Sequence, residues 1–120
     1  MTKPALAAAL YLANYVASQD GFQQEEGWVL DHELSSFNLS PEDFAEVGEI
    51  FRQLDLDGAV DIIWASDQSC KDEAQALIFL TMLNDRVIDP SESTAYFDIC
   101  KRCELTRDLS INEAHAIIGF

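Results

Sequence analysis

Two turns of the chain carry acidic side chains whose types and spacing suit the binding of a divalent cation. The residues are Asp20, Glu26, Asp85, Asp89 and Glu92, with Glu25 beside Glu26. Carboxylate oxygens are the ligands that calcium and magnesium prefer, but calcium takes about six to eight oxygens and magnesium keeps several of its waters. Two or three carboxylates at each turn therefore predict weak, hydrated binding of calcium or magnesium.

A helix start explains part of the second turn without any ligand. Asp89 is followed by Pro90 and then by Glu92, which is the pattern of a capping box. In this interpretation Asp89 caps the helix, Glu92 completes the box, and both acids favour the positive end of the helix. Asp85 then ends the preceding helix or bonds the amides of the turn. Capping is the simpler interpretation, and cation binding is the functional alternative.

The elements that must position these turns are helices. A capping residue with an acid three positions later occurs at 40–43, 69–72, 89–92 and 110–113. Together with the apolar periodicity, these signals predict helices near 4–18, 23–37, 41–54, 59–66, 70–84, 90–103 and 111–118. No strand-like alternation is sustained in the sequence. The expected fold class is therefore all-α, a single-domain bundle of about seven helices over residues 1–120.

Two of these helices are apolar on nearly every side. The run from Ala5 to Ala13 is apolar, and the run from Ala74 to Leu83 is interrupted only by Gln75 and Thr81. A helix that is apolar all round must be surrounded by protein, so we expect these two helices to form a central pair. The N-terminal run also resembles the apolar part of a secretory signal, but we expect it to be mature structure, because its removal would take away half of that centre.

The chain also contains a faint internal repeat. Leu12–Asp20 aligns with Leu77–Asp85 at an offset of 65, and after a turn that is one residue shorter in the first copy the offset becomes 66, which pairs Glu26 with Glu92. Each copy reads as a buried helix, an acidic turn and an amphipathic helix. We therefore expect a pseudo-two-fold bundle with copies over about 5–55 and 70–120.

This pattern resembles the TerB-like domains of tellurite-resistance proteins and of the co-chaperone DjlA. Their signature is an apolar helix ending in Asp-Gly, an aliphatic residue shortly afterwards, and a Glu at the start of the next helix, all of it repeated. The matching residues are Asp20, Gly21, Phe22 and Glu26 in the first copy and Asp85, Ile88 and Glu92 in the second. The resemblance implies an all-helical bundle linked to stress responses that binds metal through acidic residues, and it implies no enzyme activity.

Two departures from the signature bear on the metal sites. The first turn is one residue shorter than the second, and Arg86 stands where the family usually has Gly. A left-handed backbone at that position is easy for Gly and costs another residue about 1 kcal/mol. Arg86 also puts a cation beside the expected ligands, which weakens the second site in particular.

The charge of the chain restricts its partners. Its formal net charge is −15, and the segment from Asp20 to Asp67 contains thirteen acids and one base, Arg52. Such a surface repels phosphate backbones and anionic lipid, so we expect no binding to nucleic acid or to membranes. A basic protein face would be attracted. The alternative function is therefore that of an acidic inhibitor, immunity-like protein or nucleic-acid mimic that covers a basic partner.

Three further candidate sites are weak. Cys100 and Cys103 have CxxC spacing but lie near a helix end, so we expect small core residues; three cysteines in all indicate a reducing, cytoplasmic compartment. The stretch 55–64 resembles a calcium loop, but it lacks the acids required at its first and twelfth positions. His32 and His115 are isolated. No apolar stretch is long enough to span a bilayer.

Overall fold

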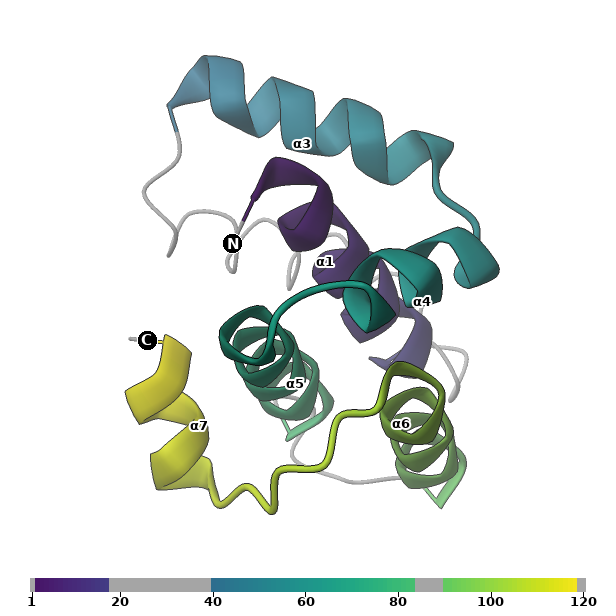
Figure 1. The fold of residues 1–120 in the computed structure, drawn as a ribbon, viewed down its shortest axis with the longest axis vertical. Helices are drawn as coiled ribbons and strands as arrows, with labels where there is room; N and C mark the ends of the chain where they lie inside the picture. The colour runs from purple at the N-terminus through teal and green to yellow at the C-terminus, as the bar shows by residue number, and fades with distance from the viewer. Residues whose placement is uncertain (1, 18–39, 84–89, 119–120) are drawn as a thin grey trace.

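Two apolar helices, α1 (Lys3–Ala17) and α5 (Gln68–Leu83), form the centre of the molecule (Figure 1). The computed structural model describes residues 2–17, 40–83 and 90–118. Within these ranges α1 and α5 contact each other more extensively than any other pair of helices. Ten residues of α1 are buried, most of them alanines, and small side chains allow two helices to approach closely. The predicted central pair is confirmed.

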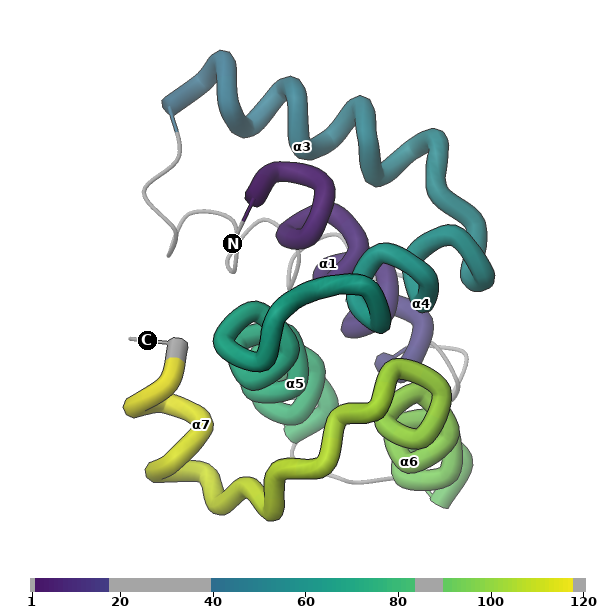
Figure 2. Tube along the Cα trace, viewed as in Figure 1, coloured from purple at the N-terminus to yellow at the C-terminus, as the bar shows by residue number. Residues whose placement is uncertain are grey.

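The outer helices pack around this pair. They are α3 (Pro41–Gln53), α4 (Leu56–Trp64), α6 (Pro90–Cys103) and α7 (Ile111–Ile118). Helices α3 and α4 lie against α1, α7 lies against α5, and α6 contacts α1, α4 and α5 (Figures 1 and 2). Every contact of α7 that is extensive within the described ranges is made with α5. The two central helices therefore carry most of the packing.

The helices make one compact globule. The Cα radius of gyration is 12.9 Å, against about 13–14 Å expected for a chain of this length. The described ranges contain six helices and no strand, which confirms the all-α class. The seventh predicted helix, over 23–37, lies outside the described residues. None of the helices in the described ranges is both long and apolar enough to cross a membrane.

Three helix starts lie where the capping signals put them. The Ser40 hydroxyl accepts a hydrogen bond from the Asp43 amide at 3.1 Å, and the Ser110 hydroxyl accepts one from the Glu113 amide at 3.2 Å. Each bond satisfies one of the backbone donors that a helix start leaves without a partner. Helix α6 begins at Pro90 as predicted, whereas Asp89 lies outside the described residues.

Two other predicted starts are wrong. Helix α5 begins at Gln68 and not at 70, because the Asp67 carboxylate accepts from the Cys70 amide at 2.8 Å and so caps the helix in place of Ser69. Helix α4 begins at Leu56 and not near 59, because the Asp55 carboxylate accepts from the Gly58 amide at 2.7 Å. In both cases an Asp, a residue type preferred at helix N-caps, caps a helix that begins earlier in the chain than predicted. The stretch that resembles a calcium loop is thus a capped helix.

A residue with a strained backbone ends α6. Glu104 has φ 59°, the left-handed region that favours glycine. The Leu105 amide donates to the Cys100 carbonyl at 2.8 Å, and Leu105 is buried, which is the arrangement of a Schellman cap. After this cap the chain turns back toward α5 and continues into α7.

Replacing Glu104 with glycine should raise the free energy of unfolding by about 0.5–1 kcal/mol, because it relieves the left-handed strain. The measurement is a urea titration. Glu104→Ala is the control, since it also removes the carboxylate that lies 3.8 Å from the Lys71 ammonium but keeps the strain. Equal stability of the two variants would show that φ costs nothing at this position.

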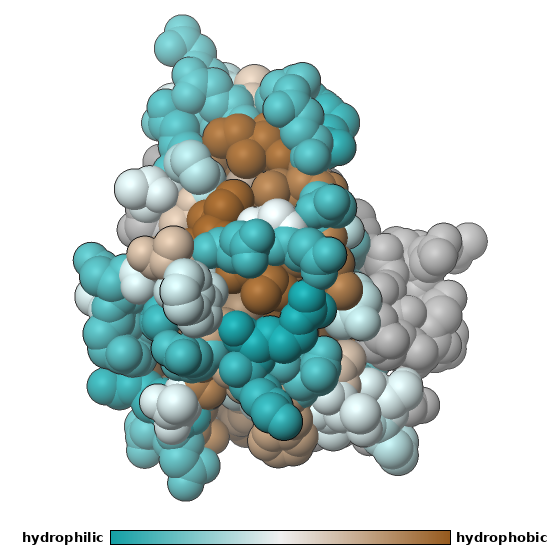
Figure 3. All heavy atoms as spheres, turned by 45° about the vertical axis from the view of Figure 1, so that its right-hand side comes forward, coloured by the Kyte–Doolittle hydropathy of each residue, from teal (hydrophilic) through white to brown (hydrophobic). Residues whose placement is uncertain are grey.

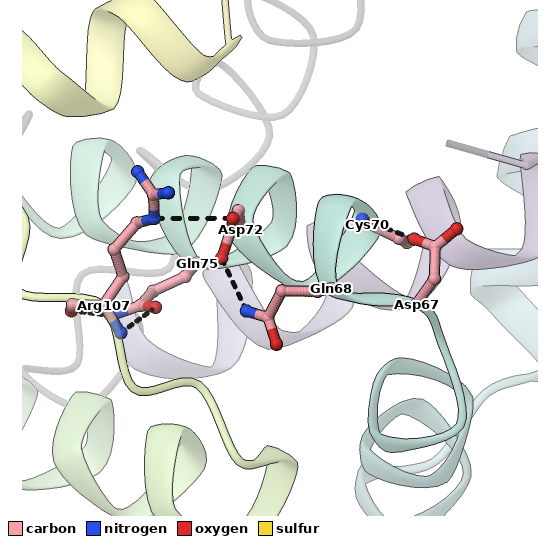
Figure 4. A network of polar contacts seen from close by, with 6 residues as sticks. All are labelled: Asp67, Gln68, Cys70, Asp72, Gln75 and Arg107. Carbon is pink, nitrogen blue, oxygen red and sulfur yellow. Dashed lines mark hydrogen bonds and ion pairs between the residues drawn. The ribbon is translucent and has the colours of Figure 1, made fainter.

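A buried amide fastens the segment between α6 and α7 to the centre (Figure 4). The Gln75 side chain on α5 is 3% exposed and donates to the Arg107 carbonyl at 2.6 Å and to the Tyr96 hydroxyl at 3.1 Å. Its oxygen accepts from the Arg107 amide at 3.1 Å. Beside it, the Arg107 guanidinium lies 3.4 Å from the Asp72 carboxylate. Gln75 thus supplies hydrogen-bond partners to the backbone of Arg107, which lies after the end of α6.

Candidate functional site

The start of α6 is the part of the predicted cation site that the structure describes. Of the predicted ligands, Glu92 lies in this helix turn. The others are outside the described residues: Asp20, Glu26, Asp85 and Asp89, together with Glu25. The structure therefore places one of the five predicted ligands. Cation binding at the two acidic turns, the first corner (Asp20 and Glu26) and the second corner (Asp85, Asp89 and Glu92), stays a prediction.

Glu92 is fully buried. Its side chain is 0% exposed, and neither carboxylate oxygen is accessible to solvent. Glutamate is almost never buried in this way unless it is paired, hydrogen-bonded or bound to a metal, because removing a carboxylate from water is costly. Two uses fit a carboxylate in the first turn of a helix: bonding to the amides of that turn, and coordination of a hard cation.

The packing of α6 explains why this carboxylate is inside. The buried residues of the helix follow one stripe and are Glu92, Ala95, Tyr96, Ile99, Cys100 and Cys103. These positions recur at the three- and four-residue spacing of a helix face that packs on a core. Glu92 therefore occupies the first position of an otherwise apolar stripe. The periodicity of α6 indicates this burial, which the capping-box interpretation does not address.

Oxygen-bearing side chains surround the outer side of the same turn. An open hollow of about 470 Å³ lies between the end of α1 and the start of α6, with Tyr15, Ser91 and Thr94 among its lining residues. The Thr94 hydroxyl donates to the Pro90 carbonyl at 2.8 Å. Within residues 2–17, 40–83 and 90–118, no three metal-binding side chains come together. A cation held by Glu92 must therefore take its other ligands from water or from the segments next to this turn.

The acids of the predicted acidic segment that the structure describes, within residues 42–67, are exposed or partly exposed. Asp57 pairs with Arg102 at 2.7 Å, which ties α4 to α6. Lys3 pairs with Asp43 at 3.0 Å and with Glu46 at 2.6 Å, which ties α1 to α3. The two hydrogen bonds raise the pKa of Lys3, and the bond from Lys3 lowers the pKa of Asp43. Exposed pairs of this kind contribute little stability.

A second hollow, of about 460 Å³, opens between the start of α1 and the start of α5. Its lining residues are Thr2, Ala5, Ser66, Asp67, Ser69, Cys70 and Glu73. The Asp67 carboxylate is already engaged with the Cys70 amide. The hollow is open to solvent, and no histidine is among these lining residues. His115 is exposed on α7, and His32 lies outside the described residues.

The CxxC cysteines belong to the core, as predicted. Cys103 is 0% exposed and Cys100 is 7% exposed, and both pack in the main hydrophobic cluster. Burial raises the pKa of each thiol to about 11. A thiol with so high a pKa is protonated at neutral pH and is a poor nucleophile and a poor metal ligand.

Thiol counting should therefore separate the cysteines. At pH 8 the folded protein should react with Ellman's reagent at one thiol, the half-buried Cys70, and the protein in guanidinium at all three. Absorbance of the released thiolate gives the count. A Cys70→Ala variant should show no fast reaction when folded, and rapid labelling of two thiols in that variant would contradict the burial of the pair.

Comparison with known proteins gives a fold but no family. No protein-family model matches the sequence, and no curated protein matches it. A crystal structure of PG1108, a protein of unknown function from Porphyromonas gingivalis W83, superposes with a TM-score of 0.75. The match covers 98% of this chain and 97% of that chain, at 20% identity. At this identity the likeness establishes a shared fold and carries no function.

Proposed function

We propose that this protein is a small TerB-like binding module that holds a divalent cation, calcium or magnesium, weakly at its acidic corners. The observation that carries the proposal is the buried Glu92 carboxylate in the first turn of α6. It stands at the position of the Glu in the TerB-like signature. Asp85 and Asp89 are close to it in the sequence, and carboxylate oxygens are the donors that these cations prefer. The role is binding and not catalysis.

The proposed ligands are Asp85, Asp89 and Glu92 at the second corner and Asp20 and Glu26 at the first. The internal repeat is part of the same proposal. It is supported by the packing of α3 on α1 and of α7 on α5, since equivalent helices in two copies should make equivalent contacts. A part in a stress response, such as tellurite resistance, follows from the resemblance alone, and a cytoplasmic location follows from the three cysteines.

The test is a cation titration of the wild type and of Glu92→Gln. Calorimetry and melting temperature should show a saturable response to calcium or magnesium at sub-millimolar concentration. The affinity should fall about tenfold or more in Glu92→Gln, which keeps the shape of the side chain but removes its charge. Manganese and zinc are titrated in parallel to define the preference.

Glu113→Gln is the matched control. Glu113 has the same place in the first turn of α7, three residues after its cap, but is exposed. Its replacement should leave the cation response unchanged. The absence of any saturable wild-type response below millimolar would leave capping as the role of the corner and end the cation proposal.

A second candidate is an acidic protein that covers a basic partner, in the manner of an inhibitor or immunity protein. It is favoured by the charge of α3 and α4, where residues 41–64 contain seven acids and one base. Such a complex should weaken as salt is raised. In a pull-down it should depend on these acids and not on Asp85.

A further inference from the structure

The outer face of α4 combines acids with an exposed aromatic side chain. Asp57, Asp61 and Trp64 follow one another at intervals of four and three residues, so they share one face of the helix. Trp64 is 53% exposed, which is unusual for so large an apolar side chain. The side of α4 that packs on the core carries the buried Ala59, Val60 and Ile63.

Apolar surface continues from α4 onto the end of α3. The partly buried apolar residues of α3, α4 and the turn between them pack against the core and keep part of their surface exposed; they are Ile50, Phe51, Leu54, Leu56 and Ile62. Figure 3, which brings the side of α3 and α4 forward, shows apolar atoms gathered in the middle of this face and framed by hydrophilic residues. An apolar strip framed by polar groups is the usual make-up of a protein-binding surface.

The frame is acidic and only partly neutralised. Within residues 41–64 the single base, Arg52, pairs with Glu49 at 2.8 Å. Lys3 and Arg102 reach in from α1 and α6 to pair with other acids of the segment. Among the described residues no ion pair engages Glu42 or Asp61, and both are exposed. The face thus keeps an excess of negative charge beside its apolar strip.

We propose that the α3–α4 face docks a basic amphipathic helix of a partner protein. The apolar side of such a helix would cover the strip, its Lys or Arg side chains would face the acids, and an Arg would stack on Trp64 beside Asp61. A second copy of this chain is a poor occupant, because each copy carries a net charge of −15.

Helix α6 also carries an exposed aromatic residue next to an acid, and this pair can be compared with Asp61 and Trp64 on α4. Phe97 is 69% exposed and Asp98 is exposed. One helical turn further on, however, stand Lys101 and Arg102, so this face lacks the excess negative charge. The pair on α6 therefore serves as the matched control for the pair on α4.

The probe is a labelled synthetic peptide with leucines on one helix face and lysines on the other, and binding is followed by fluorescence anisotropy with EDTA present. The wild type should bind the peptide, and more weakly as salt is raised. Asp61→Lys combined with Trp64→Ala should weaken binding about tenfold or more. Phe97→Ala combined with Asp98→Lys, which makes the same change in charge and aromatic content, should leave binding within about twofold of wild type.

Three results would overturn the docking face: equal losses in the two double variants, equal binding of a scrambled peptide of the same composition, or no binding to the wild type at low salt. Melting temperature is recorded for each variant, and Asp61→Lys alone decides the outcome if Trp64→Ala lowers it. Because EDTA removes divalent cations and the residues lie on different helices, failure here would leave the proposed cation corner standing.

Discussion

Leu77→Ala should lower the free energy of unfolding by about 3–5 kcal/mol, the range found for leucines removed from well-packed cores. Leu77 is 0% exposed in the middle of α5, on the helix that contacts α1 most extensively. Its loss would leave a cavity in the main hydrophobic cluster, to which Leu77 belongs. A loss of this size is a large part of the stability of a domain this small. Urea titration followed by circular dichroism is the measurement.

Leu80→Ala on the same helix is the control. Leu80 is only partly buried, so its truncation should cost about 1–2 kcal/mol. Both substitutions change the helix propensity equally, and the difference between them reports burial between the central helices. If the two variants unfold at the same urea concentration, α1 and α5 do not form the centre of the molecule.

Gln75→Leu should lower the free energy of unfolding by about 2–4 kcal/mol, even though it places a better hydrophobe in the core. The substitution removes three hydrogen bonds and deprives the Arg107 amide and carbonyl of their partner. A backbone group left without a partner away from water costs about 1–3 kcal/mol. The segment between α6 and α7 should loosen first, which amide hydrogen exchange would show as lost protection of Arg107.

Tyr96→Phe separates the parts of this network. It removes the hydroxyl that accepts from Gln75 and leaves the bonds to Arg107 in place, so it should cost about 1 kcal/mol. If Gln75→Leu costs no more than Tyr96→Phe, the bonds to the Arg107 backbone add nothing to stability.

Most helices of this fold can be predicted from the sequence. Helix starts at Pro41, Pro90 and Ile111 follow from caps that are local, and the central pair follows from two runs without polar interruption. The sequence does not predict the start of α5 correctly, because Asp67 and Ser69 both suit a cap, and the choice depends on which one reaches a free amide in the folded chain.

The candidate site is harder to predict from the sequence than the helices are. Glu92 satisfies both the capping-box pattern and the apolar stripe of α6, and sequence alone does not say which of the two decides its position. Gln75 looks like an interruption in an apolar run, and its role depends on Arg107, which is 32 residues away. Contacts of that kind are set by tertiary packing. They leave no local signal in the chain.

The fold that this chain shares with PG1108 from Porphyromonas gingivalis extends over nearly the full length of both chains. It shows that the helical arrangement persists when four residues in five differ. Because one fold serves many functions, the shared fold does not support cation binding, which we propose from the buried Glu92 and from the resemblance of the acids to the TerB-like signature.

The most direct test of that claim is a crystal structure obtained with millimolar manganese, measured above and below the manganese absorption edge. We expect an anomalous peak at the start of α6, at a coordination distance of roughly 2.0–2.6 Å from a Glu92 oxygen, and no such peak in crystals of Glu92→Gln. A well-ordered map with manganese present and no anomalous density at this corner, with the Glu92 carboxylate bonded only to backbone amides, would contradict the proposed function.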